Sequence, residues 1–504
     1  MTNFPSGNKL SPSASEPLYL QLAAIIAEQI YQGALTAGTK LPPERELALQ
    51  FSVSRTTAIN AYRHLDTQGL VVSKIGSGTY VAYEAPAHPE KKLAMPWEQL
   101  FSPHLDTPMS SILRDLVDTP TANQTISLAA GMPDPAFYPL DIFNEILTRE
   151  FRSIDPSDLG HIPTEGLPAL RRVIAARSQA KGIASSPENV LILTGSQQGI
   201  YLINRIFIEP GDYVVVEAPT YIGAIQAFQA AGARILSLPA ADHISMELME
   251  DYLTRYRPKL FYTVTTFQNP KGSVMTLEER KALLQLAARY RMIIVEDEPY
   301  GELYYDAPPP PSLKALDEYN CVLYLGTFSK VLFPGLRTGW LEGPPLVINR
   351  LAQEKQYIDL HTNNLTQWLL ACYLQGEHLD YHLVKVRKEY KQRRDAMVSA
   401  IRRYCRDEVS FTIPEGGFYL WCRLNRQVSS RTLAHEAMKA GVSIVPGEAF
   451  YANRQGNHEM RLCYVTHEAP LLTEGIKRLS RLIARLPEEK SSPDAAFHLN
   501  PLIV

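Results

Sequence analysis

The chain has 504 residues, of which 45% are hydrophobic and 20% are charged, and this composition is typical of a soluble globular protein with more than one domain. The formal net charge of −3 excludes a chain-wide attraction to nucleic acid, so any DNA contact must come from a local basic surface. The five cysteines are scattered without a Cys-x-x-Cys pair, and no apolar run is long enough to span a bilayer. We therefore expect a cytoplasmic protein with no membrane partner, no disulfide framework and no metal site.

The first part of the chain predicts a flexible leader followed by a small, mainly helical module. Residues 1–16 are rich in Ser, Pro and Asn, so we expect them to form the leader. Apolar residues at helical spacing predict three short helices: 18–30, 44–51 and 55–68. Two apolar runs, 70–72 and 79–81, flank a Gly-Ser-Gly turn and predict a β-hairpin. Three helices followed by a glycine-tipped hairpin are typical of a winged helix-turn-helix, here over 17–83.

The third helix carries residues that suit DNA at its N-terminus. Ser54 is a good helix cap, and the following Arg55 can make a bidentate contact with guanine. The hydroxyls of Thr56 and Thr57 can bind phosphate. Between residues 40 and 80 there are five basic and three acidic residues, a net charge of +2. Because this basic surface is modest, we expect tight binding to need two copies on one operator.

This module resembles the winged helix of the GntR family nearly position for position. The matching positions are Leu41-Pro42, Glu44-Arg45-Glu46-Leu47-Ala48, Val53-Ser54-Arg55-Thr56-Thr57, Ala61-Tyr62, Leu65, Gly69 and Gly76-Ser77-Gly78. The resemblance implies a set of DNA-binding residues: Arg45, Ser54, Arg55, Thr56, Thr57 and Gly76. Pro43 departs from the pattern, because the family often has Ser at that position.

The composition changes twice after the hairpin. Residues 84–123 include a Pro- and Lys-containing stretch and are expected to form a linker. From 124 to 487, apolar β-rich runs alternate with helical patterns, which predicts an α/β domain built on a mainly parallel sheet. The strongest runs are 190–193, 213–216, 260–264, 292–295 and 322–325. A long charged helix after Gly376 and mixed elements beyond it predict a smaller α+β lobe, and 488–504 is expected to be a tail.

Chemically distinctive residues stand at the ends of these predicted strands. Lys330 follows the run 322–325, and burial there would lower the pKa of its amine toward that of a nucleophile. Asp297 ends the preceding buried strand, where a carboxylate can pair with a protonated pyridine nitrogen, and Tyr300 can reach a ring hydroxyl. A Schiff-base lysine and a carboxylate opposite the ring nitrogen are requirements of pyridoxal phosphate.

Other strand ends supply a phosphate cradle and a stacking face. The Gly-containing stretch 194–199 joins a strand to a helix, so its N–H groups suit a dianion. Arg337 lies seven residues after Lys330 and offers a guanidinium for phosphate. Tyr221 follows another strand and can stack on the cofactor ring.

The order of these residues resembles fold-type I aminotransferases over 126–486. The resemblance implies the following cofactor residues: Ser196, Gln197, Tyr221, Asn269, Asp297, Tyr300, Thr327, Lys330 and Arg337. It also implies that Arg461 binds a ligand carboxylate and that Gly131 lies on the loop that closes over the ligand. Two residues depart from the pattern. Lys271 replaces a usual Thr and adds a charge near the site. His161 stands where the family often has a tyrosine that the neighbouring subunit gives to the phosphate; it could still donate a hydrogen bond to the cofactor, or it could be an ordinary interface histidine.

A GntR-type winged helix followed by an aminotransferase-like domain resembles the MocR/GabR family of bacterial regulators. The resemblance implies a pyridoxal-phosphate-dependent transcriptional regulator that binds operator DNA as a homodimer, commonly head-to-tail. Its ligand would be an amino acid or related amine that forms an external aldimine in place of Lys330. Two alternatives stay open: a working aminotransferase with an accessory DNA-binding module, and a regulator whose aminotransferase fold binds no cofactor.

Overall fold

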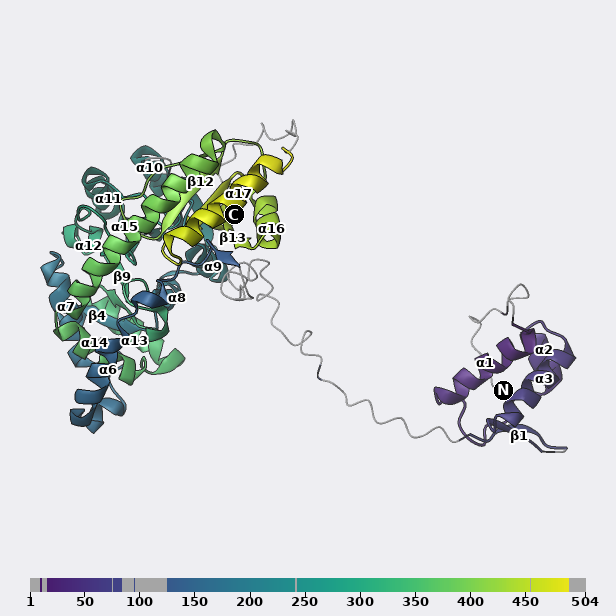
Figure 1. Ribbon diagram of the computed structural model, residues 1–504. Coiled ribbons are helices and arrows are strands. Elements are labelled where there is room, and N and C mark those ends of the chain that lie inside the picture. Colours follow the sequence, from purple (N-terminus) through teal and green to yellow (C-terminus); the bar gives the residue numbers. More distant parts are fainter. Residues whose placement is uncertain are drawn as a thin grey trace. The chain divides into compact units, whose positions relative to one another are not determined.

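The computed structural model describes residues 10, 16–74, 76–83, 95, 125–240, 243–453 and 455–488. The chain divides into two compact units, one formed by the described residues up to 83 and one by those from 125 onward (Figure 1). The predicted linker over 84–123 lies outside the described residues except for Met95. The predicted leader and tail also lie outside them, apart from residues 10, 16 and 488.

The N-terminal unit is a three-helix module closed by a β-hairpin. Its elements are α1 (Leu18–Tyr31), α2 (Glu44–Gln50), α3 (Arg55–Thr67), β1 (Val71–Lys74) and β2 (Gly78–Val81). Helix α3 begins after Ser54, whose hydroxyl accepts a hydrogen bond from the backbone N–H of Thr57 at 3.1 Å. Apolar side chains of the helices and the hairpin share one core, which includes Leu22 and Leu65. The predicted winged helix is confirmed.

A seven-stranded sheet forms the centre of the C-terminal unit. Its strands in spatial order are β4 (Val190–Leu193), β10 (Gly339–Glu342), β9 (Val322–Thr327), β8 (Ile293–Asp297), β7 (Leu260–Thr263), β5 (Tyr213–Ala218) and β6 (Arg234–Pro239). Strand β10 is antiparallel to both neighbours, whereas the remaining pairs are parallel. The predicted mainly parallel sheet is therefore confirmed, with one reversed strand that the sequence pattern does not indicate.

Helices cover both faces of this sheet (Figure 1). The helices of the unit are α6 (Leu140–Arg149), α7 (Pro168–Ala180), α8 (Ser196–Phe207), α9 (Ile222–Ala230), α10 (Met246–Arg255), α11 (Leu277–Tyr290), α12 (Leu313–Leu316), α13 (Pro345–Asp359), α14 (Asn364–Gln375), α15 (His378–Tyr404), α16 (Ser430–Lys439) and α17 (Ala469–Arg485). Because successive strand residues point to opposite faces, Val214 and Val216 pack with α8, α9 and α13, whereas Val215 packs with α10 and α11. No helix in the described ranges combines the length and apolar character needed to cross a membrane.

The smaller lobe contains a four-stranded antiparallel sheet with the spatial order β11 (Val409–Phe411), β12 (Tyr419–Leu424), β15 (Glu459–Cys463) and β14 (Val445–Pro446). The predicted α+β lobe is thus confirmed. Two short strands, β3 (Ile126–Ser127) and β13 (Val442–Ser443), pair in parallel. This pairing joins the first described residues of the C-terminal unit to the part of the chain that follows α16.

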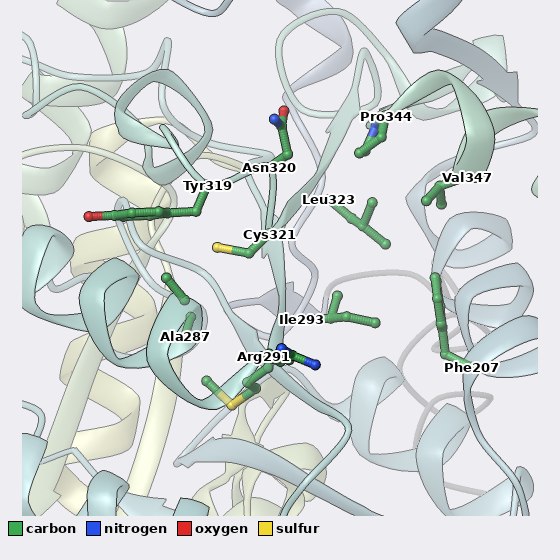
Figure 2. A pocket seen from close by; sticks show the side chains of 12 residues that line it. Phe207, Ala287, Arg291, Ile293, Tyr319, Asn320, Cys321, Leu323, Pro344 and Val347 are labelled. Atoms are coloured by element: carbon green, nitrogen blue, oxygen red, sulfur yellow. The ribbon is translucent and has the colours of Figure 1, made fainter.

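Two cavities lie at opposite edges of the seven-stranded sheet. One, of about 350 Å³, is lined by Asp297 at the end of β8 and Thr327 at the end of β9. The carboxyl edge of parallel strands is where α/β sheets bind ligands. Figure 2 shows the other cavity, of about 450 Å³, which is lined mostly by apolar side chains near the strand starts, among them Ile293 and Leu323. Only the cavity at the carboxyl edge contains residues predicted to bind a cofactor.

The described 3-10 helices are short segments between the larger elements: η2 (Pro135–Phe137), η3 (Phe151–Ser153), η4 (Pro156–Leu159), η5 (Pro187–Asn189), η6 (Pro334–Leu336), η7 (Arg406–Glu408) and η8 (Gly447–Phe450). The segment η6 matters for the carboxyl-edge cavity, because it directly precedes Arg337, whose backbone has a positive φ of 47°. This left-handed residue turns the chain from η6 into β10.

Candidate cofactor pocket and DNA-binding surface

The start of α3 presents polar side chains to solvent. Ser54, Arg55 and Thr56 are exposed, and the hydroxyl of half-buried Thr57 lies 2.7 Å from that of Ser54. Arg45 on α2 is also exposed, and neither its guanidinium nor that of Arg55 has a hydrogen bond or ion pair with another described residue. Because a helix N-terminus carries partial positive charge, this end of α3 suits a phosphate, and Arg55 remains available for a base.

The hairpin adds a basic cluster that the sequence does not indicate. Gly76 at its tip has a φ of 76°, a conformation that favours glycine. The ammonium groups of Lys40 and Lys74 lie 5.8 and 5.4 Å from the ring centroid of Tyr80. The Tyr80 hydroxyl lies 2.7 Å from that of Ser77. Two cations are thus held at the wing, although they are far apart in sequence.

The carboxyl-edge cavity brings together all the predicted cofactor and ligand residues except His161. These residues are Gly131, Ser196, Gln197, Tyr221, Asn269, Asp297, Tyr300, Thr327, Lys330, Arg337 and Arg461. They come from the last residues of β8 and β9, the start of α8, the loops that follow β3, β5, β7, β8 and β9, and β15 of the smaller lobe. The cavity therefore lies between the large sheet and the smaller lobe.

Lys330 supplies an amine with a lowered pKa. Burial, reinforced by the positive charge of Arg461, lowers the pKa of Lys330 to about 8. Its Nζ donates a hydrogen bond to the backbone carbonyl of Gly131 at 2.7 Å. At pH 7 about a tenth of this amine is then uncharged, far more than for an ordinary lysine, and the uncharged form is the one that attacks an aldehyde.

Asp297 offers one free oxygen to the cavity. Its Oδ2 accepts a hydrogen bond from the hydroxyl of Tyr262 at 2.7 Å. Its Oδ1 is buried and has no hydrogen-bond partner among the described residues. Burial raises the pKa of Asp297 to about 6, while the Tyr262 hydrogen bond and the charge of Lys330 act to lower it. A buried acceptor without a donor is rare and fits a ligand N–H group.

A phosphate cradle lies at the N-terminus of α8. Gly195 has a φ of 125°, and a side chain there would place its Cβ 3.1 Å from Nη2 of Arg337. The same Nη2 donates to the carbonyl of Thr194 at 3.0 Å, which fixes the guanidinium beside the helix terminus. Thr327 accepts a hydrogen bond from the N–H of Ser329 at 3.2 Å. The helix terminus and the guanidinium together suit a dianion.

Tyr221 and Gln197 line the same side of the cavity. The Tyr221 hydroxyl donates to Oε1 of Gln197 at 3.3 Å, and Nε2 of Gln197 donates to the carbonyl of Gly223 at 3.0 Å. Burial raises the pKa of Tyr221, so its phenol stays neutral. These bonds hold the Tyr221 ring in place as a stacking surface.

Arg461 is a buried guanidinium with an incomplete set of partners. Its Nη1 donates to Oδ1 of Asn269 at 2.9 Å, and its Nη2 donates to the carbonyl of Ala129 at 2.8 Å. Its Nε has no hydrogen-bond partner among the described residues. The guanidinium lies 4.0 Å from the ring centroid of Tyr419 and 4.9 Å from that of Phe450. A carboxylate entering the cavity would meet a cation that is already oriented.

Tyr419 is a lining residue that no motif in the sequence indicates. The Tyr300 hydroxyl donates to the Tyr419 hydroxyl at 3.1 Å. A Cβ on Gly131 would lie 1.8 Å from the Tyr419 hydroxyl oxygen, so only glycine fits there. Tyr419 and Tyr262 each lie on a strand whose sequence gives no sign of which face they occupy, and so the spacing of motifs does not reveal them.

His161 and Lys271, the two departures from the family pattern, lie outside the lining of this cavity. His161 is exposed, and its Nδ1 lies 3.4 Å from Nε2 of His361. Its contribution to a neighbouring subunit stays a prediction. The Nζ of Lys271 donates a hydrogen bond to the carbonyl of Ala240, the residue after β6, at 2.5 Å. Asn269 lines the cavity although Lys271 does not.

The residues in the cavity fit pyridoxal phosphate. The unpartnered Oδ1 of Asp297 suits the pyridine N–H, the cradle closed by Gly195 suits the phosphate, and Lys330 supplies the amine. Together with the winged helix, this pocket defines a class of protein: a DNA-binding regulator that carries an aminotransferase-like domain of fold type I.

Comparisons with known proteins agree with this class. Residues 18–81 match the family of bacterial regulatory proteins called gntR, and residues 132–479 match class I and II aminotransferases. The chain is 33% identical to YisV, an uncharacterised HTH-type transcriptional regulator of Bacillus subtilis, over 94% of this chain and 98% of YisV. It is 28% identical to the probable rhizopine catabolism regulatory protein MocR of Rhizobium meliloti, over 96% and 97% of the two chains.

Solved structures match the C-terminal unit. The kynurenine aminotransferase of Pyrococcus horikoshii is 39% identical, with a TM-score of 0.73, and covers 77% of this chain and 98% of its own. The protein therefore belongs to the MocR-type regulators, in which a GntR-type winged helix is fused to a class I and II aminotransferase domain. This fold class depends on pyridoxal phosphate, so the predicted fold, family and cofactor are confirmed.

Proposed function

We propose that this protein regulates transcription by binding operator DNA through its winged helix and sensing an amino acid or related amine in the cofactor pocket. One observation carries the proposal: the same chain has an exposed Arg55 at a recognition-helix terminus and a pocket in which Asp297 lies beside Lys330, and neither the Arg55 guanidinium nor Oδ1 of Asp297 has a partner among the described residues. The domains that we assign to these tasks are 17–83 and 124–487, joined by the linker 84–123.

Each pocket residue has a distinct task in holding the cofactor. Pyridoxal phosphate supplies an aldehyde on an electron-withdrawing ring, which condenses reversibly with primary amines. The Lys330 amine provides the attachment point, and Asp297 accepts the ring N–H. Arg337 and the first residues of α8, Ser196 and Gln197, hold the phosphate. The remaining residues surround the ring: Tyr221 on one face, and Asn269, Tyr300 and Thr327 at its polar edge.

The ligand is recognised by its amine and by an acidic group. Arg461 is buried and is oriented by Asn269 and Tyr419, and its Nε has no partner in the part of the chain that the structure describes. A carboxylate or similar anion would pair with it at the price of little reorganisation. Gly131 lies where Lys330 and Tyr419 meet, so a ligand that engages Lys330 changes the partner of the Gly131 carbonyl. We infer that this loop responds to the ligand.

A second function, repeated amino transfer, is favoured by one observation: Lys330, Asp297 and Arg461 are all present and line one cavity. We propose that the pocket serves sensing and at most a half-reaction, because similarity to the regulators extends over the winged helix as well. Multiple turnovers with a keto acid, combined with no binding to any DNA upstream of the protein's gene, would establish the enzyme instead.

We further propose a homodimer formed beside the pocket. Five large apolar side chains are exposed near His161: Leu159, Tyr357, Ile358, Leu360 and Leu365. The segment that contains Leu159 and the segment 357–365 are joined by a hydrogen bond from Asn364 to the carbonyl of Gly160 at 2.5 Å. Asp359 in the same stretch accepts hydrogen bonds from Thr194 and Gln198, so this apolar surface borders the phosphate cradle.

A two-fold dimer over this surface would bring His161 of the partner subunit toward the phosphate, and it would pair two winged helices for two half-sites. The head-to-tail arrangement belongs to the same proposal. Sedimentation of wild type and of Tyr357→Glu, which adds a charge to a side chain 86% exposed in one chain, tests it. A monomeric wild type would contradict it.

The proposed function is tested by one combined titration. Amines are added to the cofactor-loaded protein while the cofactor absorption band and the binding of DNA upstream of the gene are measured together. We expect at least one amino acid or related amine to change both signals. A ligand that changes the absorption and never the DNA binding would contradict the regulatory role.

A further inference from the structure

The carboxylate of Asp297 is held by one buried phenol. Tyr262 on β7 is fully buried, and its hydroxyl donates to Oδ2 of Asp297 on the adjacent strand β8 at 2.7 Å. Its ring packs edge-on against Phe228, with ring centroids 6.0 Å apart. Packing alone would be met by phenylalanine, and a buried hydroxyl is costly unless it is bonded. The hydroxyl is therefore explained by its bond to the carboxylate.

Because of this hydrogen bond, the two carboxylate oxygens of Asp297 have different roles. Oδ2 is occupied by Tyr262, whereas Oδ1 is buried, lacks a partner among the described residues and belongs to a residue that lines the cofactor cavity. Because burial raises the pKa of Tyr262 well above its ordinary value, the phenol stays protonated and remains a donor. The carboxylate is thus fixed in rotation and presents one oxygen to the cavity.

We propose that Tyr262 is a positioning residue that keeps Asp297 ionised and aimed, and thereby sets the protonation of the cofactor's ring nitrogen. The proposal rests on the binding of pyridoxal phosphate proposed above. A hydrogen bond to the charged carboxylate favours its ionised form, and an ionised carboxylate favours a protonated pyridine beside it. Without the phenol, Asp297 becomes the stronger base and takes a larger share of the proton.

Two side chains act on the carboxylate of Asp297: Tyr262 through a hydrogen bond and Lys330 through its charge. Lys330 lies close enough to lower its pKa by its charge, and Asp297 in turn raises the pKa of Tyr221. The preceding carboxylate, Glu296, points to other partners: it accepts a hydrogen bond from Thr265 at 2.7 Å and bonds from backbone N–H groups at the start of α12.

The test uses full-length protein loaded with pyridoxal phosphate that carries ¹⁵N at the ring nitrogen. The ¹⁵N chemical shift is followed by NMR across about pH 6 to 9, a range that spans the titration of a perturbed pair. We expect Tyr262→Phe to lower the ratio of N-protonated to O-protonated pairs by about tenfold, which moves the ¹⁵N shift on the acid side of the titration toward that of a neutral pyridine. Asp297→Asn should move the ¹⁵N shift further in the same direction.

A matched control is Tyr252→Phe. Tyr252 is also a buried tyrosine against the sheet, but its hydroxyl donates to the carbonyl of Ser237 at 3.1 Å and it packs on the face with α10 and α11. It should leave the ¹⁵N titration unchanged. If Tyr262→Phe fails to fold, 3-fluorotyrosine at position 262, a more acidic donor, should shift the titration the opposite way.

The outcomes separate two failures. Coincident titrations of wild type and the position-262 variants would overturn the role of Tyr262 while leaving cofactor binding intact. A wild-type protein that shows no bound-cofactor signal would instead overturn the proposed function, and the role of Tyr262 with it.

Discussion

The cofactor pocket and the winged-helix surface are built in opposite ways. In the pocket, Arg461 and Asp297 are buried and are held by hydrogen bonds from within the chain, with single atoms left open for a ligand. On the winged helix, Arg45 and Arg55 are exposed and lack partners among the described residues. The pocket is therefore organised before its ligand binds, whereas the DNA surface acquires its partners on binding and depends on salt.

The largest expected effect comes from a mutation that removes the function of the cofactor pocket and leaves ligand-free DNA binding intact. Lys330→Ala should abolish the ligand-dependent absorption change and the ligand response of DNA binding, because the attachment amine is gone. Ligand-free DNA affinity should change by less than about twofold, since Lys330 belongs to the pocket and only the bound ligand is proposed to couple the pocket to the winged helix. Absorption and DNA-binding titrations measure both. The exposed Lys281→Ala is the control, and a ligand response that survives in Lys330→Ala contradicts the assignment.

Arg461→Lys measures how much the fixed orientation of the Arg461 guanidinium contributes to ligand affinity. It keeps the charge but loses the planar fork that bonds Asn269 and Ala129. We expect about a 100-fold loss of affinity for an amine that bears a carboxylate, close to 3 kcal/mol. An amine without an acidic group should bind almost as before. Equal losses for both ligands would show that Arg461 does not recognise the carboxylate.

Arg55→Ala tests the exposed surface in the same way. Loss of a bidentate contact to guanine should weaken operator binding by about 2 kcal/mol, or roughly 30-fold, without changing the cofactor spectrum. Fluorescence anisotropy with labelled operator DNA provides the measurement. Arg255→Ala, on the C-terminal unit, is the control. An unchanged affinity would leave Arg55 as a solvated surface charge.

The pKa of Lys330 predicts a pH dependence for the pocket alone. With a pKa of about 8, the neutral, reactive amine increases about tenfold per pH unit below 8 and levels off above it. The rate at which cofactor-free protein takes up pyridoxal phosphate should follow this curve when absorption is monitored. A rate that still climbs tenfold per unit up to pH 10 would indicate an ordinary lysine.

The smallest expected effect concerns the wing. Lys40→Gln or Lys74→Gln should reduce the slope of log affinity against log salt by about 1 and weaken binding a few-fold, equally for specific and random DNA. Both lysines lie beside the Tyr80 ring. A loss confined to the specific operator would mean that the wing reads sequence rather than phosphate.

Much of this architecture can be predicted from local signals in the sequence. Asp297 can be recognised because it ends a short apolar strand, Lys330 because it follows one, and Ser54 because a capping residue precedes a helix. Tyr262 and Tyr419 do not stand out, since their importance depends on which face of a strand they occupy and on partners more than 30 residues away. The reversed strand β10 and the β3–β13 pair likewise depend on long-range pairing, which periodicity does not encode.

The proposed sensing function depends most directly on the covalent attachment of pyridoxal phosphate to Lys330. Borohydride reduction of the cofactor-loaded protein, followed by proteolysis and mass spectrometry, locates the pyridoxyl group. We predict a single modified lysine at position 330, with Lys271 and Lys355 unmodified. A loaded protein whose pyridoxyl group lies on another lysine, or on none, would contradict the account.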